Sequence, residues 1–246
     1  MGRNARLKRQ RREKRQREIN EGWPYFTSGR FLGEVQRLIR DSGGNIDSSV
    51  GCTKVLQEIA DELGLTIKPL SVEVTVYNPT FADHIIQHGL NPSDEDVHRL
   101  GEEGGRYVTL GSRNLKPDDP ENWHGYLVAL LTAPNKPTMV LDISIGQATR
   151  LADGIVVNRP LVFGIPDGFL AAEACAVGFQ PGPNGKICFV YRALPDDTGF
   201  EQTTDWVRSY GAKAHDNVDF GDMPLHTGGE EQDAPTEPSG EPPVGE

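Results

Sequence analysis

The chain is poor in cysteine, methionine and apolar side chains. Its 246 residues include only three cysteines and three methionines, and 36% are hydrophobic, against about 45–50% in typical domains when glycine is counted. Three cysteines do not make a disulfide framework, so we expect a reducing, cytoplasmic location. No apolar run reaches about 18 residues, and no apolar segment follows the basic start, so neither a membrane span nor a secretory signal is expected.

Charge is distributed in three zones. Residues 1–22 hold nine Lys or Arg and three acids, whereas residues 215–246 hold nine acids and no Lys or Arg. We therefore predict a basic arm over 1–22, disordered or helical, one α+β domain over 23–214, and a disordered acidic Pro/Gly-rich tail over 215–246. The arm is either a solvated terminus or a docking segment, through residues 1–20, for nucleic acid or an acidic partner.

Periodicity in the middle zone predicts helices followed by strands. Apolar residues recur at helical spacing over 28–41 and 52–63, and Ser28 is a candidate N-cap. Residues 78–120 read as an irregular insertion around one short strand. This order favours an antiparallel sheet over a doubly wound one. Alternating or dense apolar runs indicate strands at 70–76, 106–110, 124–132, 138–145, 155–157, 161–165 and 187–191.

Three residues in separate elements suggest thiol chemistry. Cys52 stands in the first turn of the second helix, where the helix dipole and free N–H groups favour a thiolate. His124 opens the first strand of a predicted hairpin, and Asp142 lies in the second. A turn centred near Asn135 places residue 128 opposite Asp142, so His124 and Asp142 share a face of the sheet. Nucleophile, base and orienting acid are the parts of thiol acyl transfer.

This ordered set resembles the transglutaminase-like superfamily, including its bacterial cysteine peptidases. Gly51-Cys52 heading an apolar helix, His124-Gly125-Tyr126 and Leu141-Asp142 match the three motif positions in order. The resemblance covers about residues 45–145 and implies a transglutaminase-like or papain-like core. It indicates a bacterial or phage-borne member of this superfamily.

The resemblance implies a mechanism for each residue. The Cys52 thiolate attacks a peptide or amide carbonyl, His124 protonates the leaving amine, and Asp142 fixes the imidazole tautomer. The backbone N–H of Cys52, or Asn45, stabilises the oxyanion. Gly51 leaves room for substrate, and Trp123 either lines the acyl channel or only packs. No cofactor is required, and hydrolysis is not separated from transfer.

A competing hypothesis is a non-catalytic binding protein on the same fold, with the basic arm as its docking segment. Cys52 is then an ordinary buried thiol. His84 and His88 have the i, i+4 spacing of zinc ligands, but Ile85 stands where a zincin has glutamate, so no metal site is predicted. Cys175 and Cys188 lie in apolar surroundings and are expected in the core.

Overall fold

The computed structural model describes residues 13–14, 17, 19–63, 65–90, 92–111, 123–166, 168–170 and 175–207. These residues form an α+β domain with an antiparallel sheet, as predicted, and the sheet is curled. No helix in these ranges is long and apolar enough to cross a membrane. The acidic tail and most of the basic arm lie outside the described residues.

Two helices cover one face of the sheet. α2 (Gly29–Asp41) begins as predicted, with the Ser28 side chain accepting a hydrogen bond from the Phe31 N–H. α3 (Ser49–Leu63) begins three residues earlier than predicted. A preceding helical segment, 19–26, buries Ile19 in the same core. Packing against the domain therefore already begins within the stretch assigned to the basic arm.

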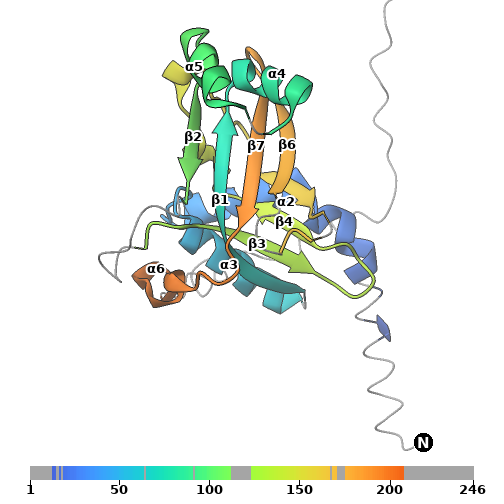
Figure 1. Ribbon diagram of the computed structural model, residues 1–246. Coiled ribbons are helices and arrows are strands. Elements are labelled where there is room, and N and C mark those ends of the chain that lie inside the picture. Colours follow the sequence, from blue (N-terminus) through green and yellow to red (C-terminus); the bar gives the residue numbers. More distant parts are fainter. Residues whose placement is uncertain are drawn as a thin grey trace, which may run out of the picture.

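The sheet is built around one long strand, β1 (Thr66–Tyr77). Its first half pairs with β3 (Tyr126–Thr132) on one edge, and β2 (Tyr107–Leu110) takes over that edge further along. β7 (Gly185–Ala193) pairs with the other edge. Beyond them lie β4 (Met139–Asp142), β5 (Leu161–Gly164) and β6 (Cys175–Gly182). The strand order is β5-β4-β3-β1-β7-β6, so β5 and β6 are the two ends. In Figure 1, β1, β7 and β6 stand side by side while β3 crosses below.

Two hydrophobic cores lie on opposite faces of this sheet. The first joins α2, α3 and the 19–26 segment to one face, through residues such as Ala129 and Leu141. The second fills the concave side with alternate residues of the same strands, such as Val128 and Val140. This separation follows from the alternation of side chains along a strand. Residues 126–131 do not alternate between apolar and polar side chains, because this strand is buried on both faces.

The predicted irregular insertion contains two helices. α4 (Pro79–His88) begins at Asn78, whose side chain accepts from the Phe81 N–H and donates to the carbonyls of Gly104 and Asp153. α5 (Asp94–Glu102) begins with a capping box. Both helices sit at the upper end of β1 (Figure 1). The expectation of irregular structure over 78–120 is therefore wrong for 79–102, because local N-caps start helices there.

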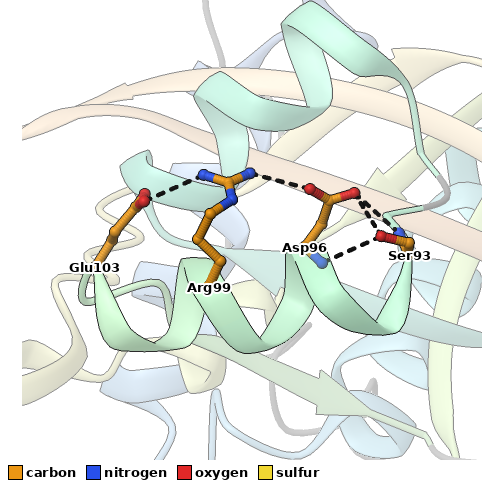
Figure 2. A network of polar contacts seen from close by, with 4 residues as sticks. All are labelled: Ser93, Asp96, Arg99 and Glu103. Carbon is orange, nitrogen blue, oxygen red and sulfur yellow. Dashed lines mark hydrogen bonds and ion pairs between the residues drawn. The ribbon is translucent and has the colours of Figure 1, made fainter.

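Figure 2 shows the capping box that starts α5. The Ser93 hydroxyl accepts from the Asp96 N–H, and the Asp96 carboxylate accepts from the Ser93 N–H and hydroxyl. Arg99 joins this cap to Glu103 through ion pairs of 3.0 and 3.1 Å. These hydrogen bonds hold the pKa of the exposed Asp96 at about 2.

The remaining strands close the sheet toward its two ends. β4 (Met139–Asp142) is shorter than predicted, because the chain turns into a 3-10 segment at Ile145–Ala148. The expected strand at 155–157 is only a single bridge between Arg150 and Ile155. β5 (Leu161–Gly164) agrees with the prediction, whereas β6 (Cys175–Gly182) was not predicted. Three short helices complete the described chain: Leu151–Asp153, Gly199–Gln202 and α6, Thr204–Val207.

Candidate functional site

Cys52 lies in the first turn of α3 and its side chain is fully buried in the core. Its exposed fraction is 0%, and its Sγ donates to the carbonyl oxygens of Asn45 and Ile46, at 3.7 and 3.4 Å. Burial, together with the charges of Asp142 and Asp47, raises the pKa of Cys52 to about 12. The expectation of a thiolate favoured by the helix start therefore does not hold in this conformation.

The predicted oxyanion groups also have structural roles. Because α3 begins at Ser49, the N–H of Cys52 is already bonded to the carbonyl of Ser48, at 2.9 Å. The Gly51 N–H is bonded to the Ser48 hydroxyl. The Asn45 side chain accepts from the Asp47 N–H, which fixes the turn before the helix. The N–H of Cys52 is therefore already used within the helix. The Asn45 side chain, whose NH₂ group would be the oxyanion donor, is held in the turn through its oxygen.

Asp142 is fully buried and held by two tyrosines. One carboxylate oxygen accepts from the Tyr126 hydroxyl and the other from the Tyr191 hydroxyl, both at 2.7 Å. Ser144 donates to the Tyr126 oxygen at 3.3 Å. Burial raises the pKa of Asp142 to about 6, although the two tyrosine hydrogen bonds act in the opposite direction. Asp142 therefore orients the hydroxyl groups of Tyr126 and Tyr191, and not the predicted imidazole.

His124 is not joined to this carboxylate. Ala129 pairs with Leu141, which places residue 128 opposite Asp142 as predicted. Tyr126 is therefore two residues from that position and His124 is four. The strand begins only at Tyr126, so His124 precedes it and is exposed. Among the described residues, the side chain that reaches Asp142 from this strand is that of Tyr126.

His124 instead lines a polar cleft of about 360 Å³ at the start of α3. Trp123 lines the same cleft, with its indole N–H donated to Asp197 and its ring packed on Phe200. This anchoring favours the packing role for Trp123. Cys52, Asn45 and Gly51 are not among the lining residues. These are Asp47, Ser48, Ser49, Val50, Trp123, His124, Gly125, Gln147, Thr203 and Thr204.

A larger apolar groove lies between the two end strands of the sheet. Its volume is about 560 Å³, within the range of about 300–1,000 Å³ that small-ligand sites occupy. Tyr191 lines it, so the groove reaches the tyrosine that holds Asp142. Phe163 of β5 contacts Tyr191 of β7, with ring centroids 4.9 Å apart. The walls are residues 161–166 and 175–179 together with Phe189 and Tyr191.

The remaining histidine and cysteine candidates do not form a metal site among the described residues. His84 and His88 stack with ring centroids 4.7 Å apart, and no cluster able to hold a metal occurs in the described ranges. Cys188 is fully buried as expected, whereas Cys175 is half-buried and lines the apolar groove. None of the three cysteines, all of which lie in the described ranges, forms a disulfide.

Sequence reasoning missed Tyr126, Tyr191 and the groove. Tyr126 was visible within the His124-Gly125-Tyr126 motif, on the same strand face as Asp142. Tyr191 carries no such signal, because it meets Asp142 only through the pairing of β1 with both β3 and β7. No family model matches the chain, and neither curated proteins nor solved structures gave a match.

Proposed function

We propose that the chain is a binding protein, and that its ligand site is the apolar groove between β5 and β6. The observation that carries this proposal is the groove itself, which has a volume of about 560 Å³ and no charged side chain among the described residues of its walls. A quarter of the chain's residues are charged, so a wall of this size without charged side chains differs from the rest of the chain. Such a wall selects an apolar, uncharged ligand, because a charged ligand would lose its hydration there without gaining a partner. Two apolar residues of the groove wall are exposed, Val177 at 42% and Phe179 at 45%. Their exposure also supports an apolar ligand.

The surroundings of Cys52 and Asp142 support binding over thiol catalysis. A thiol nucleophile acts as the thiolate, whereas the pKa of Cys52 is raised to about 12. A triad acid orients its histidine, whereas Asp142 accepts from two tyrosines. The thiol-dependent acyl-transfer or hydrolytic enzyme of transglutaminase-like fold stays a competing prediction. It requires a rearrangement that exposes Cys52 and brings His124 to Asp142.

The location of the chain belongs to the same proposal, whereas the role of the arm does not. The absence of a disulfide among the three described cysteines supports a reducing, cytoplasmic setting. Docking of residues 1–20 to nucleic acid or an acidic partner is a separate prediction, since those residues lie mostly outside the described ranges. None of the described residues that line the groove belongs to the arm, so we expect deletion of residues 1–18 to leave binding there unchanged.

Titration with N-phenyl-1-naphthylamine, a neutral apolar fluorophore, tests the proposal. We expect saturable fluorescence and slower alkylation of Cys175, the half-buried thiol in the groove wall. Val177→Asp places a charge in that wall and should weaken binding about tenfold or more. Val97→Asp is the matched control, because Val97 is 37% exposed on α5, outside the groove. Equal binding by both variants, or no saturable binding, would reject the groove as the site.

A further inference from the structure

The groove meets the edges of the two end strands and not only their faces. Successive side chains of a strand point to opposite faces. The walls nevertheless include every residue of 161–166 and of 175–179. A cavity that touches an unbroken run of residues lies along the strand edge, where the backbone N–H and C=O groups are. Within the described part of the chain, β5 pairs only with β4, and β6 only with β7.

Pro181 shows which residues of β6 direct their backbone outward. Proline has no N–H, so within a paired strand it stands where the nitrogen faces away from the neighbour. Pro181 lies inside the β6–β7 pairing, opposite Lys186. Backbone direction alternates along a strand. Val177 and Phe179 therefore share the parity of Pro181, and their N–H groups face away from β7, toward the open edge.

The outward face of β6 is apolar as well. The side chains of Val177 and Phe179 alternate with the inward-facing Ala176 and Gln180, which are buried. A solvated face of an antiparallel sheet ordinarily carries polar side chains. An open edge that is also apolar is the surface to which an added strand binds. Val177 and Phe179 are two residues apart, so an added strand that bonds both N–H groups covers about 7 Å of this edge.

We propose that the occupant of the groove is an extended peptide with uncharged side chains, which adds as a strand to the outer edge of β6. This inference rests on the proposed function and names its ligand class. A hydrocarbon ligand would cover the outward N–H and C=O groups without bonding them, at the cost of their desolvation. An extended peptide bonds them and places alternate side chains on Val177 and Phe179.

The test compares two peptides on the full chain. The first is the blocked hexapeptide Ac-Thr-Val-Thr-Val-Thr-Val-NH₂, and the second has the same sequence with alternate amide nitrogens methylated. The readout is the rate at which iodoacetamide modifies Cys175. We expect the first peptide to slow this rate about threefold at twice its Kd, and the methylated peptide to protect much less.

Two variants separate backbone pairing from side-chain contact. Val177→Pro removes one outward N–H at the parity where Pro181 already stands, and we expect it to abolish protection by the peptide. Val177→Thr keeps the N–H and the branched shape, and it should retain protection. Circular dichroism and thermal melting establish that each variant is folded. If Val177→Pro does not fold, Phe179→Lys, which charges the apolar face, takes its place with the same expected loss.

The outcomes distinguish the inference from the proposed function. Strand addition would be overturned if both peptides protected Cys175 equally. It would also be overturned if the first peptide protected Cys175 equally in both Val177 variants. Protection by naphthylamine but by neither peptide would also overturn it while leaving the groove as a binding site. Loss of binding of all three probes would reject the proposed function itself. If protection of Cys175 grows with protein concentration in the absence of peptide, the edge binds a second copy of the chain. That result would overturn the proposal that the occupant is a peptide.

Discussion

Tyr126 and Asp142 are joined by a 2.7 Å hydrogen bond at a place where sequence reasoning expects a histidine to meet the acid. The tyrosine hydroxyl donates to one oxygen and Tyr191 donates to the other. Asp142 thereby connects the hairpin of β3 and β4 to β7 on the far side of β1. The three residues form a buried polar link across the concave core, and the link ends at the wall of the apolar groove.

The two tyrosines should contribute to stability through the same carboxylate. Tyr126→Phe or Tyr191→Phe removes one donor from a buried acid, and each should lower the free energy of unfolding by about 1–3 kcal/mol. The double variant leaves Asp142 without either donor, so its loss should differ from the sum of the two. Urea unfolding measures all three. Tyr107→Phe, at a ring 55% exposed, is the control and should change stability by less than about 0.5 kcal/mol.

Asp142 should also give the fold a specific pH dependence. Its pKa is raised from 3.8 to about 6 in the folded chain, so the folded state holds this proton after the unfolded state has released it. Its contribution is therefore most favourable below about pH 4, and it is lost as pH rises through about 6. Relative to Asp142→Asn, the wild type should lose up to about 3 kcal/mol between pH 4 and 7. A pH-independent difference in urea unfolding would contradict the buried acid.

The two helix caps at the upper end of β1 should differ in strength. Asn78 is buried and bonds three backbone groups, so Asn78→Ala should cost about 3 kcal/mol. Ser93 caps α5 at the surface (Figure 2), and Ser93→Ala should cost about 1 kcal/mol. Arg99→Ala, which breaks only exposed ion pairs, should cost less than either. Guanidinium unfolding midpoints give this order, and equal losses for Asn78 and Ser93 would contradict it.

Local signals in the sequence predicted much of this architecture. The apolar stripe after Ser28 predicted α2, and the turn near Asn135 predicted the β3–β4 register. The helices of the supposed insertion were equally local, because Asn78-Pro79 and the Ser93–Asp96 pair are N-terminal helix signals. Glycines and prolines in the surrounding stretch favour irregular structure, but the two N-caps outweigh them over 79–102.

The site could not be predicted in the same way, because its geometry is not local. The even spacing that puts His124 on the face of Asp142 also puts Tyr126 there, two residues closer. Which side chain reaches the acid depends on where the strand begins and how the sheet twists. The groove depends on the curl that brings β5 and β6 together, and those strands are separated in the sheet by four others.

The most direct test is the relative alkylation of the three cysteines in the native chain. We expect iodoacetamide at pH 7–8 to modify Cys175, with slower modification in the presence of the blocked peptide. Cys52 and Cys188 should remain unmodified, and His124→Ala should change nothing. Rapid modification of Cys52 below pH 8, lost in His124→Ala, would contradict this account. That result would establish the thiolate–imidazolium pair of an enzyme.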